Sequence, residues 1–144
     1  MDVKSEQSVV SLVAHLNKAV HRLTSEELLG MRMKLYMVLG YIRDHPGATQ
    51  QELERALFID ANSVVLILNE LEAAQFSIRR RDPNDRRRHI VEITARGRTA
   101  LERADKAREG VEDELLKPLS SEERKTLHRL LERVLQGVLT EARA

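Results

Sequence analysis

The chain has 144 residues, the size of one compact domain or of one domain with an added dimerisation element. Its 24 lysines and arginines nearly balance 23 aspartates and glutamates, and the formal net charge of +1, taken alone, argues against a nucleic-acid ligand. The absence of cysteine excludes disulfides, thiolate metal sites, cysteine nucleophiles and thiol redox switches. The longest uncharged run, residues 7–17, is far shorter than the ~20 apolar residues that span a bilayer, and the first residues are polar. We therefore expect a cytoplasmic protein that does not enter a membrane.

The first part of the chain predicts two helices. Between residues 5 and 23, apolar side chains recur at three- and four-residue spacing, as they do on one face of a helix. They are Val9, Leu12, Val13, Leu16, Val20 and Leu23. Thr24-Ser-Glu-Glu27 has the spacing of a capping box and predicts the start of a second helix. Its apolar stretch runs over residues 28–42, and Pro46-Gly47 ends it.

Two shorter helices are predicted next. Thr49-Gln-Gln-Glu52 is another capping box, and Asp60 is a suitable N-cap for a helix over residues 61–74. One face of that helix carries the apolar residues Val64, Ile67, Leu68 and Leu71, which we expect to lie in the core. The short connection over residues 58–60 is typical of a helix-turn-helix.

The pattern then changes to short β-branched segments around the run Arg79-Arg-Arg-Asp-Pro-Asn-Asp-Arg-Arg-Arg88. Pro83-Asn84 is a turn signal, so this run predicts a β-hairpin with a charged tip. Thr94-Ala-Arg-Gly97 opens a long charged helix that reaches about Leu116, and Ser120-Ser-Glu-Glu123 opens a final helix. The final helix repeats apolar residues at roughly heptad spacing: Leu127, Leu130, Leu131, Val134, Leu135 and Val138.

This order of elements predicts a mainly α-helical fold with a small β wing, formed by the whole chain, residues 1–144, as a single unit. A winged helix-turn-helix is expected over residues from about 30 to 98. Helical dimerisation regions are expected at about 5–23 and 98–142, because the apolar stripes there need a covering surface.

The small net charge hides a local asymmetry. Residues 49–78 hold one arginine and five acidic residues, a net charge of −4, whereas residues 79–88 hold six arginines and two aspartates, a net charge of +4. Six guanidinium groups on one turn repel one another unless an anion is near, and arginine binds phosphate oxygens in pairs. The alternative is a soluble edge hairpin protected from aggregation by charge, for which one or two lysines usually suffice. We therefore favour contact with phosphates.

The stretch from about Leu35 to Arg98 resembles the MarR family of bacterial transcription regulators (multiple antibiotic resistance regulators). The most specific part is the wing pattern D-P-x-D-R-R, followed by a strand and then by [LI]-T-x-x-G-R. The other matching segments are His45-Pro-Gly-Ala-Thr-Gln-Gln-Glu-Leu53, Asp60-Ala-Asn-Ser-Val64 and Leu71-Glu72. The flanking helices match the family in order and length rather than in motif.

The resemblance implies a homodimer with interlocked terminal helices, which binds a palindromic duplex operator and commonly acts as a repressor. The second helix of the helix-turn-helix would enter the major groove, and the wing would reach the flanking minor groove. At the wing tip, Asp85 would orient the loop and Arg87 would insert. The candidate DNA-binding residues are Thr49, Gln50, Asn62, Ser63, Val65, Leu66, Arg79, Arg80, Arg81, Asp85, Arg86, Arg87 and Arg88.

The sequence departs from the family pattern at five positions near this interface, one of which is Glu54 in place of a small residue. Val65 and Leu66 replace residues that are usually polar, and either they contact thymine methyl groups or they pack in the core. Gln75 stands where the family often has glycine, and Ser77 stands at a usually apolar position. These departures leave the fold prediction intact and the operator sequence open.

Family members are commonly released from DNA by a small aromatic or phenolic carboxylate, bound where the dimerisation helices meet the winged region. The candidates here are His21, Arg22, Arg32 and Tyr36, because an arginine and a tyrosine in an apolar crevice can hold a carboxylate and stack on its ring. In the competing interpretation the arginines are surface charges and Tyr36 belongs to the core.

Other classes of function have weaker support. The sequence has no glycine-rich phosphate loop, H-E-x-x-H motif or nucleophile elbow, so we expect no catalytic residue and no cofactor. No metal site is expected, since no two histidines have i, i+3 or i, i+4 spacing among His15, His21, His45, His89 and His128. The remaining alternative is a winged-helix dimer that binds a partner protein instead of specific DNA. The acidic helix-turn-helix favours that alternative, and the six-arginine wing opposes it.

Overall fold

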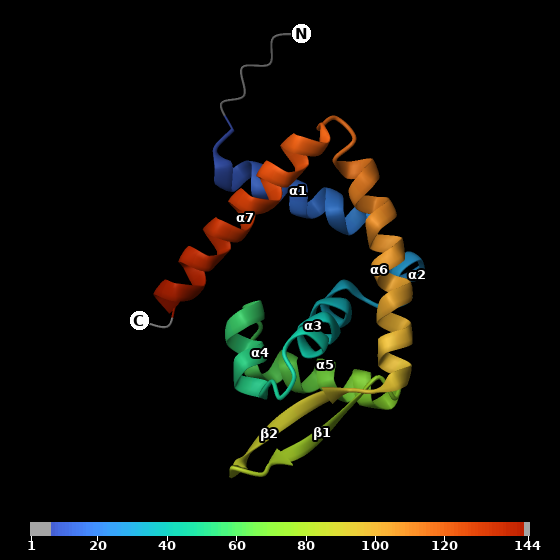
Figure 1. Ribbon diagram of the computed structural model, residues 1–144, viewed down its shortest axis with the longest axis vertical. Coiled ribbons are helices and arrows are strands. Elements are labelled where there is room, and N and C mark those ends of the chain that lie inside the picture. Colours follow the sequence, from blue (N-terminus) through green and yellow to red (C-terminus); the bar gives the residue numbers. More distant parts are fainter. Residues whose placement is uncertain (1–6, 143–144) are drawn as a thin grey trace.

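The computed structural model describes residues 7–142, which form seven helices and one antiparallel pair of strands (Figure 1). In chain order these are α1 (Val9–Leu23), α2 (Glu26–Leu29), α3 (Met33–Asp44), α4 (Gln50–Leu57), α5 (Ala61–Ala73), β1 (Ser77–Asp82), β2 (Asp85–Ile93), α6 (Ala95–Leu115) and α7 (Ser121–Ala142). The predicted fold class, mainly helical with a β wing and helices at both ends, is confirmed. The first expected helical region was placed from residue 5, and residues 5 and 6 lie outside the described residues.

Hydrogen bonds in the first turn explain where three of the helices begin. The Thr49 hydroxyl accepts from the backbone N–H three residues later at 3.2 Å, and the Asp60 carboxylate does the same at 3.1 Å. Ser120 and Glu123 cap each other, since each side chain accepts from the other residue's N–H, at 3.2 and 2.9 Å. These side chains satisfy amide groups that have no partner inside the helix. The predicted starts of α4, α5 and α7 are therefore confirmed.

The segment between α1 and α3 differs from the prediction. Ser25, not Thr24, caps α2, and the Thr24 hydroxyl instead donates to a backbone carbonyl of α1. Helix α2 ends after one turn at Gly30, whose φ of +79° is left-handed, and α3 begins at Met33. The single helix predicted over residues 28–42 is therefore two helices, because glycine adopts this terminating conformation without a steric cost.

The apolar core lies in the winged region, between α3, α5, β2 and the first half of α6. Helix α5 turns its four predicted core residues inward, and each of them is at most 3% exposed. The large residues that are less than 2% exposed are Leu29, Val38, Leu39, Ile42, Leu53, Val64, Leu68, Leu71, Val91 and Leu101. Full burial of one such side chain contributes about 1.5–3 kcal/mol, so this cluster is the main source of stability in the described chain.

A tight junction connects the hairpin to α6. The Thr94 hydroxyl accepts from the Gly97 N–H at 2.9 Å, which caps α6, and donates to the Gln75 carbonyl at 2.7 Å. A Cβ atom on Gly97 would lie 2.1 Å from the carbonyl oxygen of Phe76. The T-x-x-G sequence therefore fastens the start of α6 to the end of α5.

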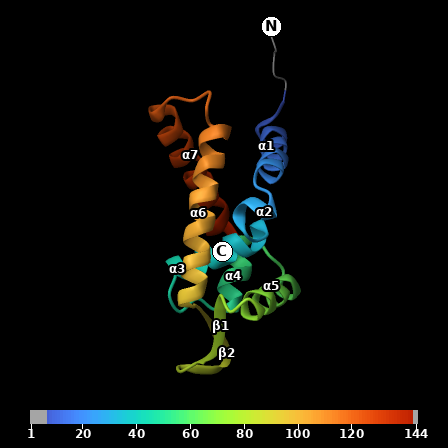
Figure 2. The same cartoon turned by 90° about the vertical axis from the view of Figure 1, so that its right-hand side faces the viewer.

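The two terminal helices lie away from the core. Helix α6 extends from the hairpin to the opposite end of the molecule, where α1 lies and where α7 begins before it runs back toward α4 (Figures 1 and 2). No residue of α1, and no residue of α7 up to position 141, is buried. Large exposed apolar side chains cover both helices: Val9, Val10, Leu12, Val13, Leu16 and Leu23 on α1, and Leu130, Leu131, Val134, Leu135 and Val138 on α7. Over residues 7–142, no helix combines the length and the apolar character needed to cross a bilayer.

Candidate nucleic-acid interface

Helices α4 and α5 form the helix-turn-helix, joined by residues 58–60 as predicted. Phe58 adopts a left-handed conformation with φ of 54°, which ends α4 abruptly, and its side chain is exposed. At the start of α4, Thr49 is only 4% exposed and its hydroxyl is engaged in capping. We therefore assign Thr49 to positioning α4 rather than to contacting DNA, whereas Gln50, the first residue of the helix, is half-buried and remains a candidate.

The outer face of α5 is open to solvent. Asn62 is exposed, as are Val65 at 38% and Leu66 at 63%. The interpretation in which Val65 and Leu66 pack in the core is therefore wrong, because the inward positions of α5 hold other residues. Ser63 is engaged with the helix start, since its hydroxyl donates to Asp60 at 2.6 Å. The Ser63 hydroxyl and N–H, by their hydrogen bonds, lower the pKa of Asp60 from its ordinary value.

The wing tip is held by two aspartates. The Asp82 carboxylate accepts from the Asn84 N–H at 2.9 Å, which forms the turn between the strands. The Asp85 carboxylate accepts from the Arg87 N–H at 3.1 Å, and the Arg87 side chain is 93% exposed. This geometry agrees with the orienting role that the resemblance implies for Asp85. Insertion of Arg87 into a groove stays a prediction.

Arg79 connects the wing to α5. It donates to both carboxylate oxygens of Glu72, at 2.6 and 3.1 Å, and to the side-chain oxygen of Asn69 at 2.6 Å. Its side chain is 23% exposed. Because its Nε and Nη2 donors already bond to acceptors within the protein, we assign Arg79 to holding the hairpin against α5, although the sequence placed it among the DNA contacts.

The other wing arginines become more exposed toward the tip. Arg80 pairs with Glu92 across the hairpin at 2.7 Å, and Arg81 donates to the Arg86 carbonyl at 2.7 Å. The side chains of Arg86 and Arg88 are exposed, as is the arginine between them. The positive charge available to an anionic ligand is therefore concentrated in these three consecutive residues of the tip.

The four candidate effector residues do not converge on one site. His21 lines a cavity between α1 and the winged region, whereas Arg22 is exposed and does not line it. Arg32 pairs with a glutamate of α5. Tyr36 faces α6, where its hydroxyl donates to Asp105 at 2.6 Å. The predicted grouping is therefore wrong, because the face of α3 that carries Tyr36 packs against α6 and not against α1.

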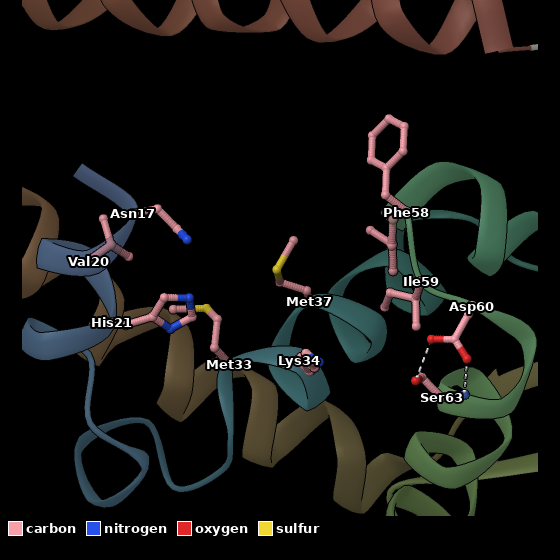
Figure 3. Close-up of a pocket in the computed structure, with 11 residues that line it drawn as sticks. Asn17, Val20, His21, Met33, Lys34, Met37, Phe58, Ile59, Asp60 and Ser63 are labelled. Carbon is pink, nitrogen blue, oxygen red and sulfur yellow. Dashed lines mark hydrogen bonds between the residues drawn. The ribbon is translucent and has the colours of Figure 1, made fainter. Parts of the chain in front are cut away.

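The cavity has a volume of about 330 Å³ and lies between α1, α3 and the turn that joins α4 to α5 (Figure 3). Its walls are mainly apolar, with polar side chains from each of these elements. They are Asn17, Val20, His21, Met33, Lys34, Met37, Leu57, Phe58, Ile59, Asp60 and Ser63. The sequence reasoning missed Lys34 and Met37. The signal that could have found Met37 is its i, i+4 spacing from Met33, which places both on one face of α3, and Lys34 is related to Met37 by i, i+3 spacing.

Tyr36 belongs to a polar network between α3 and α6. Asp105 accepts from Tyr36 and from an Arg43 Nη at 2.6 Å each, and Arg108 donates to the Tyr36 hydroxyl at 3.2 Å. Partial burial alone would raise the pKa of Asp105, but the hydrogen bonds from Tyr36 and Arg43 and the charges of the two arginines lower it. Burial, together with the hydrogen bond to Asp105, raises the pKa of Tyr36. Asp105 is therefore a carboxylate that fastens the winged region to α6.

The histidines lie apart from one another. The His45 ring stacks on the Tyr41 ring with 3.9 Å between centroids, which explains its place at the end of α3. Within the described part of the chain, no three histidine, aspartate or glutamate side chains gather as metal ligands would.

Comparison with known proteins identifies the family. A MarR family model matches residues 30–88. The transcriptional regulator HosA of Escherichia coli O111:H- is 30% identical over 131 residues, which cover 84% of this chain and 97% of HosA. A cysteine-to-serine mutant of Escherichia coli MarR, solved in complex with operator DNA, is 30% identical, with a TM-score of 0.75 over 86% of this chain and 91% of that one. The chain belongs to the MarR family.

Another crystal structure of a MarR protein extends the match to the whole MarR fold. It has a TM-score of 0.87 and 25% identity, and covers 99% of this chain and 98% of its own. The region matched by the family model begins at Gly30 and ends at Arg88, so it contains the helix-turn-helix and the wing tip. MarR-family proteins are transcription regulators that bind operator DNA and are not enzymes, which confirms the sequence-based identification.

Proposed function

We propose that this MarR-family protein is a homodimeric repressor that binds a palindromic operator and is released by a small aromatic carboxylate. Since its ligand is operator DNA, we expect it to act at the bacterial nucleoid, in the cytoplasm. The observation that carries the DNA-binding part is the wing tip, where three consecutive exposed arginines follow an aspartate that orients the loop.

The terminal helices support the homodimer. Both α1 and α7 carry exposed apolar stripes, with Val13 54% and Val134 66% exposed in the single chain. Contiguous apolar surface of this kind marks an interaction site in soluble proteins. A two-fold interface would pair each stripe with the same elements of a second copy and would cover both at once.

The basic wing tip and the acidic helix-turn-helix contact different parts of the DNA. Arginines at the tip neutralise phosphates and enter the narrow minor groove, while the outer face of α5 meets base edges in the major groove. Asn62 at the start of α5 and Gln50 at the start of α4 are the amide side chains available to hydrogen-bond there.

Alanine at Arg87 tests the wing assignment. Each neutralised phosphate contributes about −0.9 to the slope of log K against log salt, so removing one contact from each of two wings flattens the slope by about 1.8. We expect Arg87→Ala to weaken duplex binding and to flatten the slope by that amount. Arg103→Ala, on the exposed surface of α6, is the matched control and should leave the slope unchanged. A wild-type slope and affinity in Arg87→Ala would contradict the proposal.

The cavity beside α1 supports the effector part. Its apolar walls suit an aromatic ring, and the Lys34 ammonium can pair with a carboxylate. Its far wall contains Asp60 and Ser63, the hydrogen-bonded pair that begins α5 (Figure 3). A molecule in this cavity therefore contacts both a dimerisation helix and the start of the DNA-reading helix.

Release from DNA by a panel of hydroxylated benzoates tests this part. A hydrogen bond to a charged group contributes about 1.5–3 kcal/mol, so we expect Lys34→Ala to raise the concentration needed for release at least about tenfold. Lys106→Ala on α6 is the control and should respond like the wild type. If no member of the panel releases the wild-type protein, the proposed class of effector is wrong.

A further inference from the structure

We propose that α5 selects its operator by packing Val65 and Leu66 against the methyl groups of thymines in the major groove. The inference rests on the proposed binding of a palindromic operator and specifies which base pairs that operator contains. Helix α5 would recognise A·T pairs, and not guanines bound by a cationic side chain.

The composition of α5 is the first observation. Residues 61–73 contain no lysine and no arginine, although a bidentate arginine or lysine is the commonest specific contact to guanine. Asn62, Val65, Leu66 and Asn69 follow one another at i, i+3, i+4 and i+7, so they lie on one face of the helix. All four are exposed. The face that points outward therefore presents two amides and two aliphatic side chains.

The polar groups around this face are engaged, which leaves few alternatives for base recognition. Arg79 holds the side-chain oxygen of Asn69 as well as Glu72, and Glu70 pairs with Arg32. In the first turn of α5, the Ser63 hydroxyl donates to the carboxylate of Asp60, the N-cap residue. These contacts also hold Arg79 and Arg32 against carboxylates of the protein itself.

Asn62 is exposed near the start of α5, and the geometry of its side-chain amide suits the N6 and N7 atoms of adenine. One turn away, Leu66 exposes 63% of its surface and Val65 38%. In the major groove the C5-methyl group of thymine is the apolar feature that aliphatic side chains contact. An amide beside two aliphatic side chains therefore matches an adenine next to thymines.

The expected size of the effect follows from apolar burial. Removing one methyl group from such a contact costs about the transfer free energy of one buried methylene, equivalent to about fourfold in affinity. Two half-sites double the free energy, so removal of the same methyl from both should weaken binding by about fifteenfold.

The experiment begins with duplexes that the full-length protein selects from a random pool. Each thymine of the selected half-site is then replaced by deoxyuridine, which removes only the methyl group, and each cytosine by 5-methylcytosine. We expect one or two thymines per half-site to show about a fourfold loss. Leu66→Ala or Val65→Ala should abolish that loss at the same position, so that the variant binds the thymine and deoxyuridine duplexes with equal affinity.

Leu28→Ala is the matched control, because Leu28 is an apolar side chain of α2 with 48% exposure. It should keep the thymine-to-uracil ratio of the wild type, and thermal unfolding of all variants checks that they fold. If the pool yields no selected duplex, the proposed operator binding fails and this inference fails with it. If selected duplexes show no methyl dependence, or if the dependence survives in both α5 variants, only the thymine assignment is overturned.

Discussion

At the scale of single residues, Gly97 shows why the T-x-x-G motif is needed. Its place in the first turn of α6 leaves no room for a side chain, since a Cβ would lie 2.1 Å from the Phe76 carbonyl oxygen and 2.9 Å from Cγ1 of Ile93. The Phe76 carbonyl has little freedom to move, because it accepts from the Thr94 N–H at 3.0 Å. The close contact is therefore with backbone that the junction itself holds in place.

We predict that Gly97→Ala lowers the free energy of unfolding by about 2 kcal/mol, the cost typical of overpacking at a rigid position. Gly110→Ala, in the same helix, is the matched control, since nothing lies within 4 Å of a Cβ built there. It should stabilise the protein by about 0.5–1 kcal/mol because alanine favours a helix interior. Urea unfolding of the two variants measures both effects, and equal stabilities would contradict the steric explanation.

Sequence reasoning succeeded at residues whose partners are local. Thr49 and Asp60 bond to amides three residues away, so their roles follow from spacing alone. Ser77 is different: it is 1% exposed, and its hydroxyl has no hydrogen-bond partner among the described residues. Gln75 takes a positive φ of 63°, where the family often has glycine. The resemblance marked both positions as unusual, but burial and backbone angle depend on packing that one sequence does not specify.

At the scale of elements, the bond between Arg79 and Glu72 determines how the wing meets α5. A charge-assisted, two-point contact that is mostly buried resists separation of the hairpin from the helix. We predict that Arg79→Ala lowers the free energy of unfolding by about 1–2 kcal/mol, since it leaves the Glu72 carboxylate without this partner. It should weaken DNA binding without changing the salt slope. If Arg79→Ala flattened the slope of log K against log salt as Arg87→Ala is expected to do, Arg79 would instead be a phosphate contact.

The network around Asp105 makes the contact between α3 and α6 sensitive to acid. Because the pKa of Asp105 is lowered in the folded protein, the unfolded chain binds a proton more readily than the folded one. The contribution of the network to stability is thus complete above about pH 4 and is lost as the pH falls through the lowered pKa.

We predict that Asp105→Asn costs about 1–3 kcal/mol at pH 7, because it removes the negative charge and replaces one of the two acceptor oxygens that Arg43 and Tyr36 use by an NH2 donor. The difference from the wild type should shrink as the pH falls below about 4. Asp113→Asn is the control, since Asp113 is 77% exposed and its pair with Arg124 lies at the surface. Unfolding curves measured from pH 3 to 7 check the trend, and a difference that is independent of pH would count against the carboxylate's role.

Element order and type could be predicted from the sequence, but the neighbours of each helix face could not. The i, i+3, i+4 pattern of α5 placed Ile67, Leu68 and Leu71 in the core correctly, because such spacing forms one continuous stripe on a helix. The same helix also carries Val65 and Leu66 on its other side, and the pattern alone did not decide whether they are buried. Helix α3 is apolar on several sides, so its residue pattern did not indicate that Tyr36 faces α6 rather than α1. For that reason Tyr36 was grouped with His21 although the two lie on different sides of α3, and the cavity beside Lys34 became visible only in the folded chain.

At the scale of the whole molecule, the exposed apolar stripes of α1 and α7 indicate that a second copy of the chain covers them. We predict that Val134→Glu shifts the protein from dimer to monomer, because a carboxylate without a partner is costly in an apolar interface. Its DNA affinity should fall with dimerisation, while its helical content is retained. Lys125→Glu, at an exposed polar position of α7, should remain dimeric. Sedimentation of the three proteins checks this, and an unchanged mass for Val134→Glu would remove α7 from the interface.

The uninterrupted length of α6 has a mechanical consequence. Its 21 residues span about 30 Å at 1.5 Å per residue, from the junction at the wing to the end of the molecule where α1 lies. A rotation of about 5° at one end therefore displaces the other by about 2.5 Å. In a two-fold dimer both arms move, so the distance between the DNA-reading helices changes by about 5 Å, more than the 3.4 Å rise of one base step. Half-sites one helical turn apart tolerate little error in that spacing. If the protein acts as the proposed dimer, a small rotation amplified by this helix would be sufficient to disengage it from DNA, with no element needing to unfold.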